Sequence, residues 1–450
     1  MSAISKSSAS NSRETIEEMK SLARSVQRTP PEIWLSIFEH AAFVPHIFDT
    51  DFADPIEFPD TPIPFDKSAE NELKASLVTK LALICVCKSW HDLAIPLLYR
   101  AVAARDPQSL LCLRDAIARL TRPSTATRNM RVHRLDLFCW PAVEGRLASA
   151  VLVDLLSLLP DLRIACVSLP PEAKQSRVNS RQFTTDELNT LIRALSHPTH
   201  LRSLRKCILG LPKVTIEHCN ALLAQHTQLS FLYAPYPMIV GLEAQHIPAR
   251  HPLTCLFIGL KAPLIGEDAQ PLSSLRHVYI RLIALAYERG ASMEAFLRVQ
   301  GARLCTVQLD MRQYSSRPSL DHCLHLLSAH CPDLVHLIFI YDPRGTPLTS
   351  IFTALPPTVT HLGIYAEHDD PERGLCEYLR GLREFFELGD VGSVPGVIRR
   401  LNTSTEEGWA YLRDRNADLH AQCASIPVPP NCRLEDAEGR DLMLLLRNPS

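Results

Sequence analysis

The sequence predicts an α/β chain in which a small all-α module precedes an irregular solenoid of strand–helix units. Two short amphipathic segments, near residues 30–41 and 86–98, flank a stretch rich in proline and acids. After residue 100, a Leu-x-x-Leu-x-Leu-like pattern recurs at intervals of about 22–30 residues, with one gap of about 40, which is typical of stacked repeats. We expect four parts: a tail and short lead-in helix at 1–28, the helical module at 29–100, the solenoid at 101–373, and a terminal cap and tail at 374–450.

Composition restricts the class of partner. The 450 residues carry a formal net charge of −2, which argues against a general binder of nucleic acid or membrane surfaces. No apolar run is long enough to cross a bilayer, and the start lacks the apolar core of a secretion signal. The 14 cysteines are therefore expected to stay reduced, in the cytoplasm and/or the nucleus, and to pack as small hydrophobes.

The first part begins with a serine-rich stretch that we expect to be disordered, followed by a short charged helix. The helical module then opens with Thr29 and Glu32, the spacing of a capping box, and Pro31 suits a first helical turn. Apolar residues from Ile33 to Phe38 give this helix a broad apolar face. A second helix pattern resumes near residue 77, and Ser89 with Asp92 predicts another cap before the last helix.

An insertion at about residues 43–76 separates the two halves of the module. It contains five prolines between residues 45 and 64 and acids such as Asp49, Asp51, Asp54 and Glu57. This is the composition of a solvated loop, and a long loop adds closure entropy only slowly. We expect an inert loop; a second contact beside the module's partner is the alternative.

The residues of the module resemble the F-box, in the form common in large fungal families. The resemblance rests on Pro31-Glu32-Ile33, Leu35 and Ile37-Phe38, followed by Val86-Cys87-Lys88-Ser89-Trp90 and Leu93. It covers about a sixth of the chain, and the insertion is longer than the family's usual connection. The resemblance implies docking on the Skp-type adaptor, and through it the cullin, of a ubiquitin ligase. The residues it implies for adaptor binding are Pro31, Ile33, Leu35, Ile37, Phe38, Val86, Trp90 and Leu93.

The solenoid is predicted from repeated apolar triplets. Each triplet should begin one parallel strand of an inner sheet, and an outer helix should follow most strands. The copies are Val132/Leu135/Leu137, Leu162/Ala165/Val167, Leu201/Leu204, Leu229/Leu232, Leu253/Leu256/Ile258, Leu275/Val278/Ile280, Leu304/Val307/Leu309, Leu334/Leu337/Phe339 and Val359/Leu362/Ile364. Helices are expected at 149–159, 184–196, 215–226, 292–299, 319–329, 348–355, 375–386 and 409–419, and loop at 234–271.

This pattern resembles the degenerate leucine-rich repeats that often follow an F-box, although no consistent Asn or Cys marks the turn of each repeat. An ordinary α/β domain is the alternative. If the leucines point into the core, alternate residues point out along the concave sheet, where a target protein would bind. The expected target-binding residues combine aromatic, basic and acidic side chains: Phe138, Phe257, His277, Tyr279, Arg281, Asp310, His336 and Tyr365.

No motif of a common enzyme class occurs, so we expect a non-catalytic protein without a cofactor. The densest His/Cys cluster is His322, Cys323, His325, His330 and Cys331. Its spacing lacks the usual zinc-ligand frame, and packing within a helix is favoured over a metal site.

The sequence therefore favours a substrate-recognition adaptor of an SCF-type (cullin-RING) ubiquitin ligase, with an unidentified protein as substrate. Two alternatives remain: an F-box scaffold that is not linked to degradation, and, less favoured, an enzyme with an unrecognised α/β site.

Overall fold

The structure of the chain is a computed structural model. It describes residues 29–58, 68–121, 131–138, 145–168, 185–197, 201–211, 214–234, 251–259, 271–283, 289–313, 317–342, 355–366, 371–388, 394–402 and 406–447. The predicted tail and lead-in helix at 1–28 lie outside these ranges.

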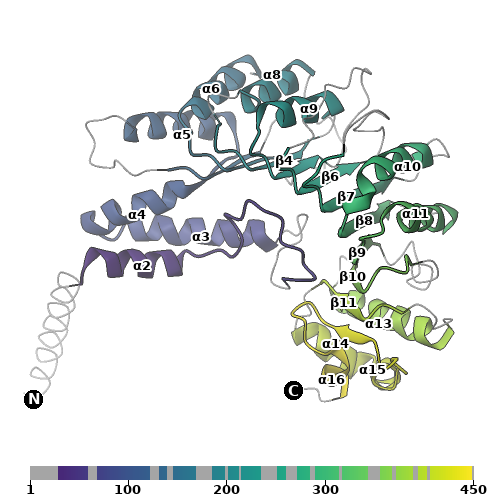
Figure 1. Ribbon diagram of the computed structural model, residues 1–450. Coiled ribbons are helices and arrows are strands. Elements are labelled where there is room, and N and C mark those ends of the chain that lie inside the picture. The colour runs from purple at the N-terminus through teal and green to yellow at the C-terminus, as the bar shows by residue number, and fades with distance from the viewer. Residues whose placement is uncertain are drawn as a thin grey trace, which may run out of the picture.

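Within the described residues, twelve strands form one sheet in which each strand lies beside the next one in the chain. All neighbouring pairs are parallel. The strands are β1 (Ala101–Ala104), β2 (Arg134–Phe138), β3 (Ile164–Ser168), β4 (Lys206–Gly210), β5 (Phe231–Ala234), β6 (Cys255–Gly259), β7 (His277–Ile283), β8 (Thr306–Gln313), β9 (His336–Tyr341), β10 (His361–Ala366), β11 (Val397–Arg400) and β12 (Arg433–Glu435). Figure 1 shows the sheet as an arc with helices along its outer, convex side.

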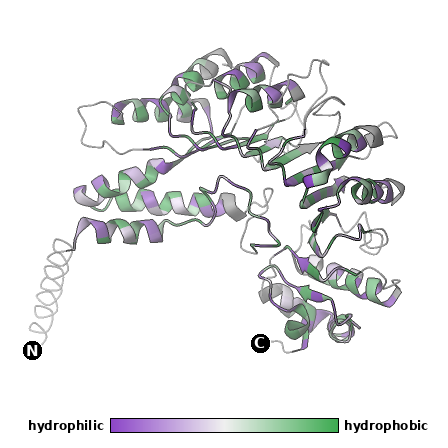
Figure 2. Ribbon diagram, viewed as in Figure 1, coloured by the Kyte–Doolittle hydropathy of each residue, from purple (hydrophilic) through white to green (hydrophobic). Residues whose placement is uncertain are grey.

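The outer layer consists of helices that return the chain from one strand to the next, followed by one helix after the last strand. They are α5 (Pro107–Leu120), α6 (Gly145–Ser157), α8 (Thr185–Leu195), α9 (Ile216–Gln225), α10 (Arg289–Gln300), α11 (Arg317–His330), α13 (Pro371–Leu388), α14 (Glu406–Arg415), α15 (Ala417–Ala424) and α16 (Leu442–Arg447). The main core lies between this layer and the sheet, and its leucines, such as Leu135, Leu256 and Leu337, are almost completely buried. Figure 2 shows the apolar residues running along the arc.

A repeated backbone turn explains the Leu-x-x-Leu spacing. Before β4, the N–H of Leu204 donates to the carbonyl of Leu201 at 3.2 Å, and before β9 the N–H of Leu334 donates to the carbonyl of Cys331 at 3.2 Å. The same bond joins Leu275 to Leu272 before β7, at 3.1 Å. The turn points the leucine side chains into the core, so apolar residues are needed at this spacing.

The predicted repeat architecture is confirmed: every apolar triplet leads into or lies in one of the strands β2 to β10, and the chain is an irregular leucine-rich-repeat-like solenoid. Helices also occupy the expected positions, except that the helix expected at 409–419 is divided at Asn416 into α14 and α15, and that 348–354 of the helix expected at 348–355 lie outside the described residues. Most of the loop expected at 234–271 lies outside them too.

Three strands were not predicted. β1 is alanine-rich, while β11 and β12 are short and carry buried charged residues, including Arg399, Arg400 and Glu435. None of them shows the leucine triplet. The sheet therefore extends past residue 373, and the region expected to be only a terminal cap supplies its last two strands.

Side chains of varied type connect neighbouring repeats where a regular repeat would use one residue type. The imidazole of His226 bonds the carbonyl of Leu195 at 2.6 Å, and that of His251 bonds the carbonyl of His226 at 3.0 Å. The amide oxygen of Gln300 accepts from the N–H of Leu272 at 2.8 Å. Buried backbone groups need such partners. Because His and Gln side chains both fill this role, no single residue type recurs at the turns.

Three helices precede the sheet: α2 (Pro31–Ala41), α3 (Ser68–Ile84) and α4 (Lys88–Arg100). We call residues 29–100 without the segment 43–67 the helical module; it continues directly into β1. The predicted caps were wrong: the N-cap of α2 is Pro30, without a side-chain bond, and that of α4 is Cys87, whose Sγ accepts from the N–H of Trp90 at 3.5 Å.

Candidate functional site

The helical module has a small aromatic core of its own. The Phe38 side chain is fully buried, and its ring lies 4.7 Å from the ring of Trp90. The Trp34 ring lies 4.8 Å from that of Trp90 and 6.0 Å from that of Phe38, so the three rings contact one another. Leu35 and Leu93 are half-buried against the same cluster. These side chains hold α2 against α4.

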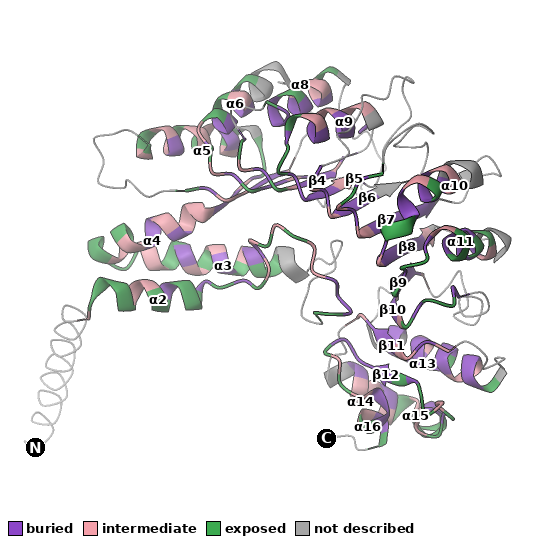
Figure 3. Cartoon of the chain, viewed as in Figure 1, coloured by how far each residue is buried: buried purple, intermediate pink, exposed green. Residues whose placement is uncertain are grey.

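Other apolar side chains of the module remain in contact with solvent. Ile33 and Ile37, one turn apart on α2, are 51% and 46% exposed, and Val86 between α3 and α4 is 58% exposed. Val78 and Leu81 on α3 are also exposed. We call these five residues the exposed apolar set. Figure 3 shows that α2 is exposed along most of its length.

This concentration is local. Among the described residues, the other exposed large hydrophobic side chains are Phe43 and Phe58, at the ends of the segment after α2, and Val335 and Leu444. Grouped exposed apolar side chains are characteristic of interaction surfaces, whereas single ones are normal. The exposed apolar set is therefore a candidate docking surface.

The residues predicted for adaptor binding fall into two groups. Pro31, Ile33, Ile37 and Val86 are exposed. Phe38 is inside the module, so the expectation that it is an exposed anchor was wrong. Its ring instead fills the space between α2 and α4. Leu35, Trp90 and Leu93 also serve mainly this core, because each is half-buried in it.

The predicted concave-face residues lie on the expected side of the sheet. Phe257, Tyr279 and Ile338 form a second apolar cluster, separate from the leucine core. Alternate positions on the same strands, such as Val278 and Leu337, belong to the leucine core. The predicted register is therefore right. Phe138, His277, Arg281, Asp310, His336 and Tyr365 share the concave side with the second cluster.

This face is not open to solvent. Residues 43–58, which we call the strap, leave α2 and cross the concave side of the sheet (Figure 1). Three strap carbonyls accept hydrogen bonds from successive parts of the sheet: Ile47 O from Arg134 Nη1 at 3.2 Å, Asp49 O from Lys206 Nζ at 3.3 Å, and Thr50 O from Ser230 Oγ at 3.2 Å.

Aromatic contacts continue the crossing. The Phe52 ring lies 6.0 Å from the ring of Phe257 on β6 and 4.6 Å from that of His277 on β7. Four residues further on, Ile56 is buried in the second apolar cluster with Phe257 and Tyr279. At the other end, Phe48 lies under the guanidinium of Arg100, which is 4.4 Å from the ring centre.

Asp54 is the polar centre of the strap. Its carboxylate is buried, accepts a hydrogen bond from the Thr306 hydroxyl, and lies 2.8 Å from His336 Nδ1. The N–H of Ile56 donates to the other carboxylate oxygen at 2.9 Å. Burial alone would raise the pKa of Asp54, but these bonds outweigh it and hold the pKa below its usual value. The carboxylate is therefore ionised at neutral pH.

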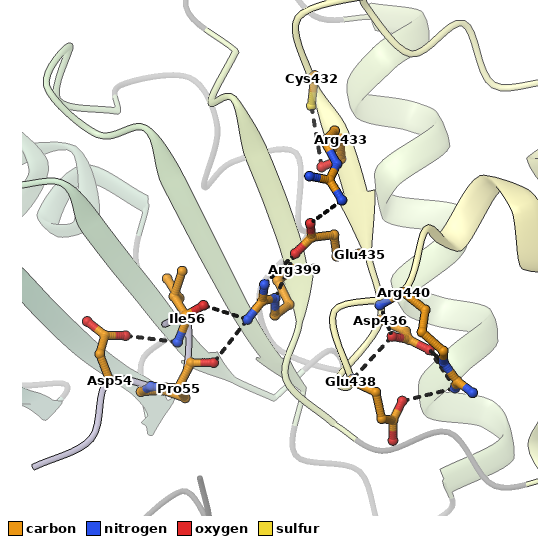
Figure 4. A network of polar contacts seen from close by, with 10 residues as sticks. All are labelled: Asp54, Pro55, Ile56, Arg399, Cys432, Arg433, Glu435, Asp436, Glu438 and Arg440. Atoms are coloured by element: carbon orange, nitrogen blue, oxygen red, sulfur yellow. Dashed lines mark hydrogen bonds and ion pairs between the residues drawn. The ribbon is translucent and has the colours of Figure 1, made fainter. Parts of the chain in front are cut away.

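Arg399 on β11 holds the next two strap residues. One of its nitrogens, Nη1, donates to the carbonyls of Pro55 and Ile56 at 3.3 and 2.6 Å, while Nε donates to Glu435 Oε2 on β12 at 2.9 Å (Figure 4). Pro55, Ile56, Arg399 and Glu435 are all buried. The last strands of the sheet thus contribute directly to holding the strap.

A second buried polar cluster lies beside the strap. The Tyr279 hydroxyl donates to Asp310, and Arg312 donates two bonds to the same carboxylate, each 2.8 Å long. Burial would raise the pKa of Asp310, but the bonds and charge of Arg312 lower it overall. Arg281 lies 3.7 Å from Asp310. This cluster fixes the side chains that surround Ile56.

The expectation of an inert loop at 43–76 was therefore wrong for the residues that the structure describes: 43–58 form the strap, and 68–76 form the first half of α3. Of the residues predicted for the concave face, Phe257, Tyr279, Asp310, His336 and Arg281 are buried, and Phe138, His277 and Tyr365 are half-buried. Acids and prolines gave this segment the composition of a loop. The signal that could have identified the strap is the regular spacing of Phe48, Phe52 and Ile56, which lie four residues apart.

Metal binding finds no support in the part of the chain that the structure describes. No group of three or more His, Cys, Asp or Glu side chains there could hold a metal ion. In the predicted His/Cys cluster, Cys323 and Cys331 are buried in the leucine core, and burial raises the pKa of each thiol to about 12. His322 and His325 are exposed on α11. No helix in the described ranges is long and apolar enough to cross a membrane.

Comparisons with known proteins add no functional evidence, so the conclusions above rest on the chain's own residues. No family model and no curated protein matches the chain. Among solved structures, the leucine-rich repeat-containing protein LegL7 from Legionella pneumophila gives a TM-score of 0.30 at 13% identity, covering 69% of this chain and 76% of that chain. A chain of the Rad7 and Elc1 complex in yeast gives 0.30 at 14% identity, covering 82% and 94%.

Proposed function

We propose that the chain is a substrate-recognition adaptor of a cullin-RING ubiquitin ligase. The helical module would dock on a Skp-type adaptor, and the solenoid would hold a target protein. One observation carries the proposal: the F-box-like order of residues coincides with a three-helix module on which Pro31, Ile33, Ile37 and Val86 are exposed.

Docking would follow the helix-in-groove mode. Ile33 and Ile37 lie one turn apart on α2 and would enter an apolar groove of the adaptor together. Burying apolar surface contributes roughly 25 cal/mol per Å², so side chains that are half-exposed in the free chain can supply binding energy. Leu81 and Val86 extend the same kind of surface to α3 and to the turn before α4.

The chain itself would perform no chemistry. Its contribution would be proximity: a bound target is held near the ligase's conjugating enzyme, which raises the effective concentration of the target lysine. We assign no catalytic residue and no cofactor to the chain. The cullin would be reached only through the adaptor, and the complex would act in the cytoplasm, the nucleus or both.

The test is binding of the full chain to a purified Skp-type adaptor. The double substitution Ile33→Asp with Ile37→Asp should weaken binding roughly 1,000-fold, because each buried anchor is worth about 2 kcal/mol. Phe38 is unsuitable for this test, because its loss would disrupt the module core.

Leu444→Asp is the matched control. Leu444 is 58% exposed, like Val86, but lies on α16 at the far end of the chain. It should leave adaptor binding unchanged, and circular dichroism should show the same helix content in all three proteins. Undiminished adaptor binding by the Ile33/Ile37 variant would rule out the proposed docking surface.

A further inference from the structure

The strap shows what kind of segment the concave face binds. It is extended, and it meets strands of the sheet in the order in which they follow one another, from β2 to β11. Arg134 and Lys206 bind its backbone carbonyls rather than its side chains. Such contacts accept many sequences, because every residue carries a carbonyl.

Selectivity arises at three consecutive residues. Thr306 and His336 both bond one carboxylate oxygen of Asp54, which is buried against the concave face; we call the part of this face that the strap covers the groove. Pro55 carries no N–H, so the groove needs no acceptor for it, and its carbonyl meets Arg399. The groove around Ile56 is apolar and includes Tyr279. The three subsites fit an acid, a proline and an aliphatic residue, in that order.

Charge supports the same chemistry. The strap carries Asp49, Asp51, Asp54 and Glu57 and no Lys or Arg. The concave face offers Arg134, Lys206 and Arg399 from β2, β4 and β11; of these, Arg134 is also paired with Asp136 and Arg399 with Glu435. Complementary charge of this kind favours an acidic segment over a basic one and speeds its capture.

We propose that the concave face is a groove for extended acidic peptides with an acid–proline–aliphatic core, and that the strap is the chain's own occupant of it. A target protein that presents such a segment binds by displacing residues 49–57. The inference rests on the proposed function for the identity of the partner as a target protein, but its test requires neither adaptor nor ligase.

Tethering sets the strength of the competition. A segment joined to its site through a short flexible connection has an effective concentration of about 1 mM. For a free peptide of strap sequence with a Kd of about 10 μM, the attached strap would weaken apparent binding about 100-fold. Weak ligands therefore cannot displace the strap, whereas ligands with a Kd well below the micromolar range can.

The probe is a fluorescent peptide with the sequence of residues 47–58. In the full chain, Asp54→Lys with Ile56→Asp should unseat the strap, because it places a cation beside His336 and Arg399 and a carboxylate in the apolar cluster. This opened chain should bind the peptide about 100-fold more tightly than the unaltered chain does. The control chain, Asp51→Lys, changes charge at an exposed strap residue and should stay closed.

Two further variants test the groove itself. A peptide carrying the Asp54→Lys change should not bind the opened chain, and His336→Ala in the opened chain should weaken binding at least about 10-fold, the loss expected for one charged hydrogen bond. A folded opened chain that ignores millimolar peptide, or that binds both peptides equally, would overturn the proposal.

A measurement on the unaltered chain covers the case in which the opened chain does not fold. Several millimolar of the unlabelled peptide should speed amide hydrogen exchange of residues 50–57, because it competes for their site. Unchanged exchange would overturn the proposal. The proposed adaptor surface is independent of both measurements, since Ile33 and Ile37 have no part in them.

Discussion

Two ionisable groups in and under the strap lose stability as pH falls, but over different pH ranges. Asp54 has a lowered pKa, so its contribution to stability is complete above the unfolded value of about 4 and is lost only as pH falls below that. His277, whose ring contacts that of Phe52 at a tilt of 47°, loses its contribution at higher pH. Burial lowers the pKa of His277 to about 4 despite the nearby charge of Asp54. The imidazole is therefore neutral in the folded chain well below pH 6.5.

This difference predicts how stability depends on pH. Between about pH 6.5 and 4, His277 binds a proton in the unfolded chain but not in the folded one, so the free energy of unfolding decreases as pH falls. A shift of this size corresponds to on the order of 3 kcal/mol. His277→Gln should remove this contribution. The free energy of unfolding, measured by urea denaturation from pH 7 to 4, should then decrease less steeply than in the unaltered chain. Parallel curves for the two proteins would contradict it, because the other histidines are common to both.

At the scale of elements, close packing between repeats predicts the effect of a single methyl group. A Cβ on Gly301, at the start of the 3₁₀ turn Gly301–Arg303, would lie 2.5 Å from the carbonyl oxygen of His330 in the next repeat. Gly301→Ala should lower the free energy of unfolding by about 1–3 kcal/mol, because backbone must move. At Gly396, before β11, the nearest atom would be 3.5 Å away, so Gly396→Ala should have little effect in the same denaturation experiment.

The elements predicted correctly from the sequence are those whose buried residues recur at regular intervals. The leucines before β2 to β10 recur because each repeat uses the same turn and the same core face, and this regularity is visible without coordinates. β11 and β12 were not predicted because Arg399 and Glu435 are buried as an ion pair, and such a pair gives no periodic apolar pattern in the sequence. Phe38 was assigned to the surface because an amphipathic pattern does not say which apolar side chains the module needs for its own core.

The strap escaped prediction for a different reason. Asp54 meets His336 across 282 residues of chain, so no local pattern in either segment reveals the pair. Acids and prolines within residues 43–58 indicate exposure when read alone. They become compatible with burial only opposite the histidine, threonine and arginine side chains of β8, β9 and β11. The sequence therefore predicted which side chains lie on the concave side of the sheet, but not that the strap covers that side.

At the scale of the whole molecule, the strap joins the helical module to the far strands of the sheet. The helical module is attached to the solenoid directly through α4 and β1, and a second time through the strap, whose start packs Val44 and Ile47 against Leu73 of α3 and Ala101 of β1. Two attachments restrict rotation of the module more than one does. If a peptide displaced the strap as proposed, the second attachment would be lost, and the helical module would gain rotational freedom.

This coupling predicts a change in distance distribution. Spin labels introduced as unnatural amino acids at the exposed positions Ser36 on α2 and Ser328 on α11 should give one narrow distance in the unaltered chain. Replacing residues 44–58 by a Gly/Ser linker of equal length should broaden it, because the module would then pivot at the junction of α4 and β1. Asp51→Lys, which leaves the buried strap contacts in place, should keep the narrow distribution. Equally narrow distributions in all three chains would show that the α4–β1 junction alone orients the module, and that the strap fills the groove without coupling the two ends.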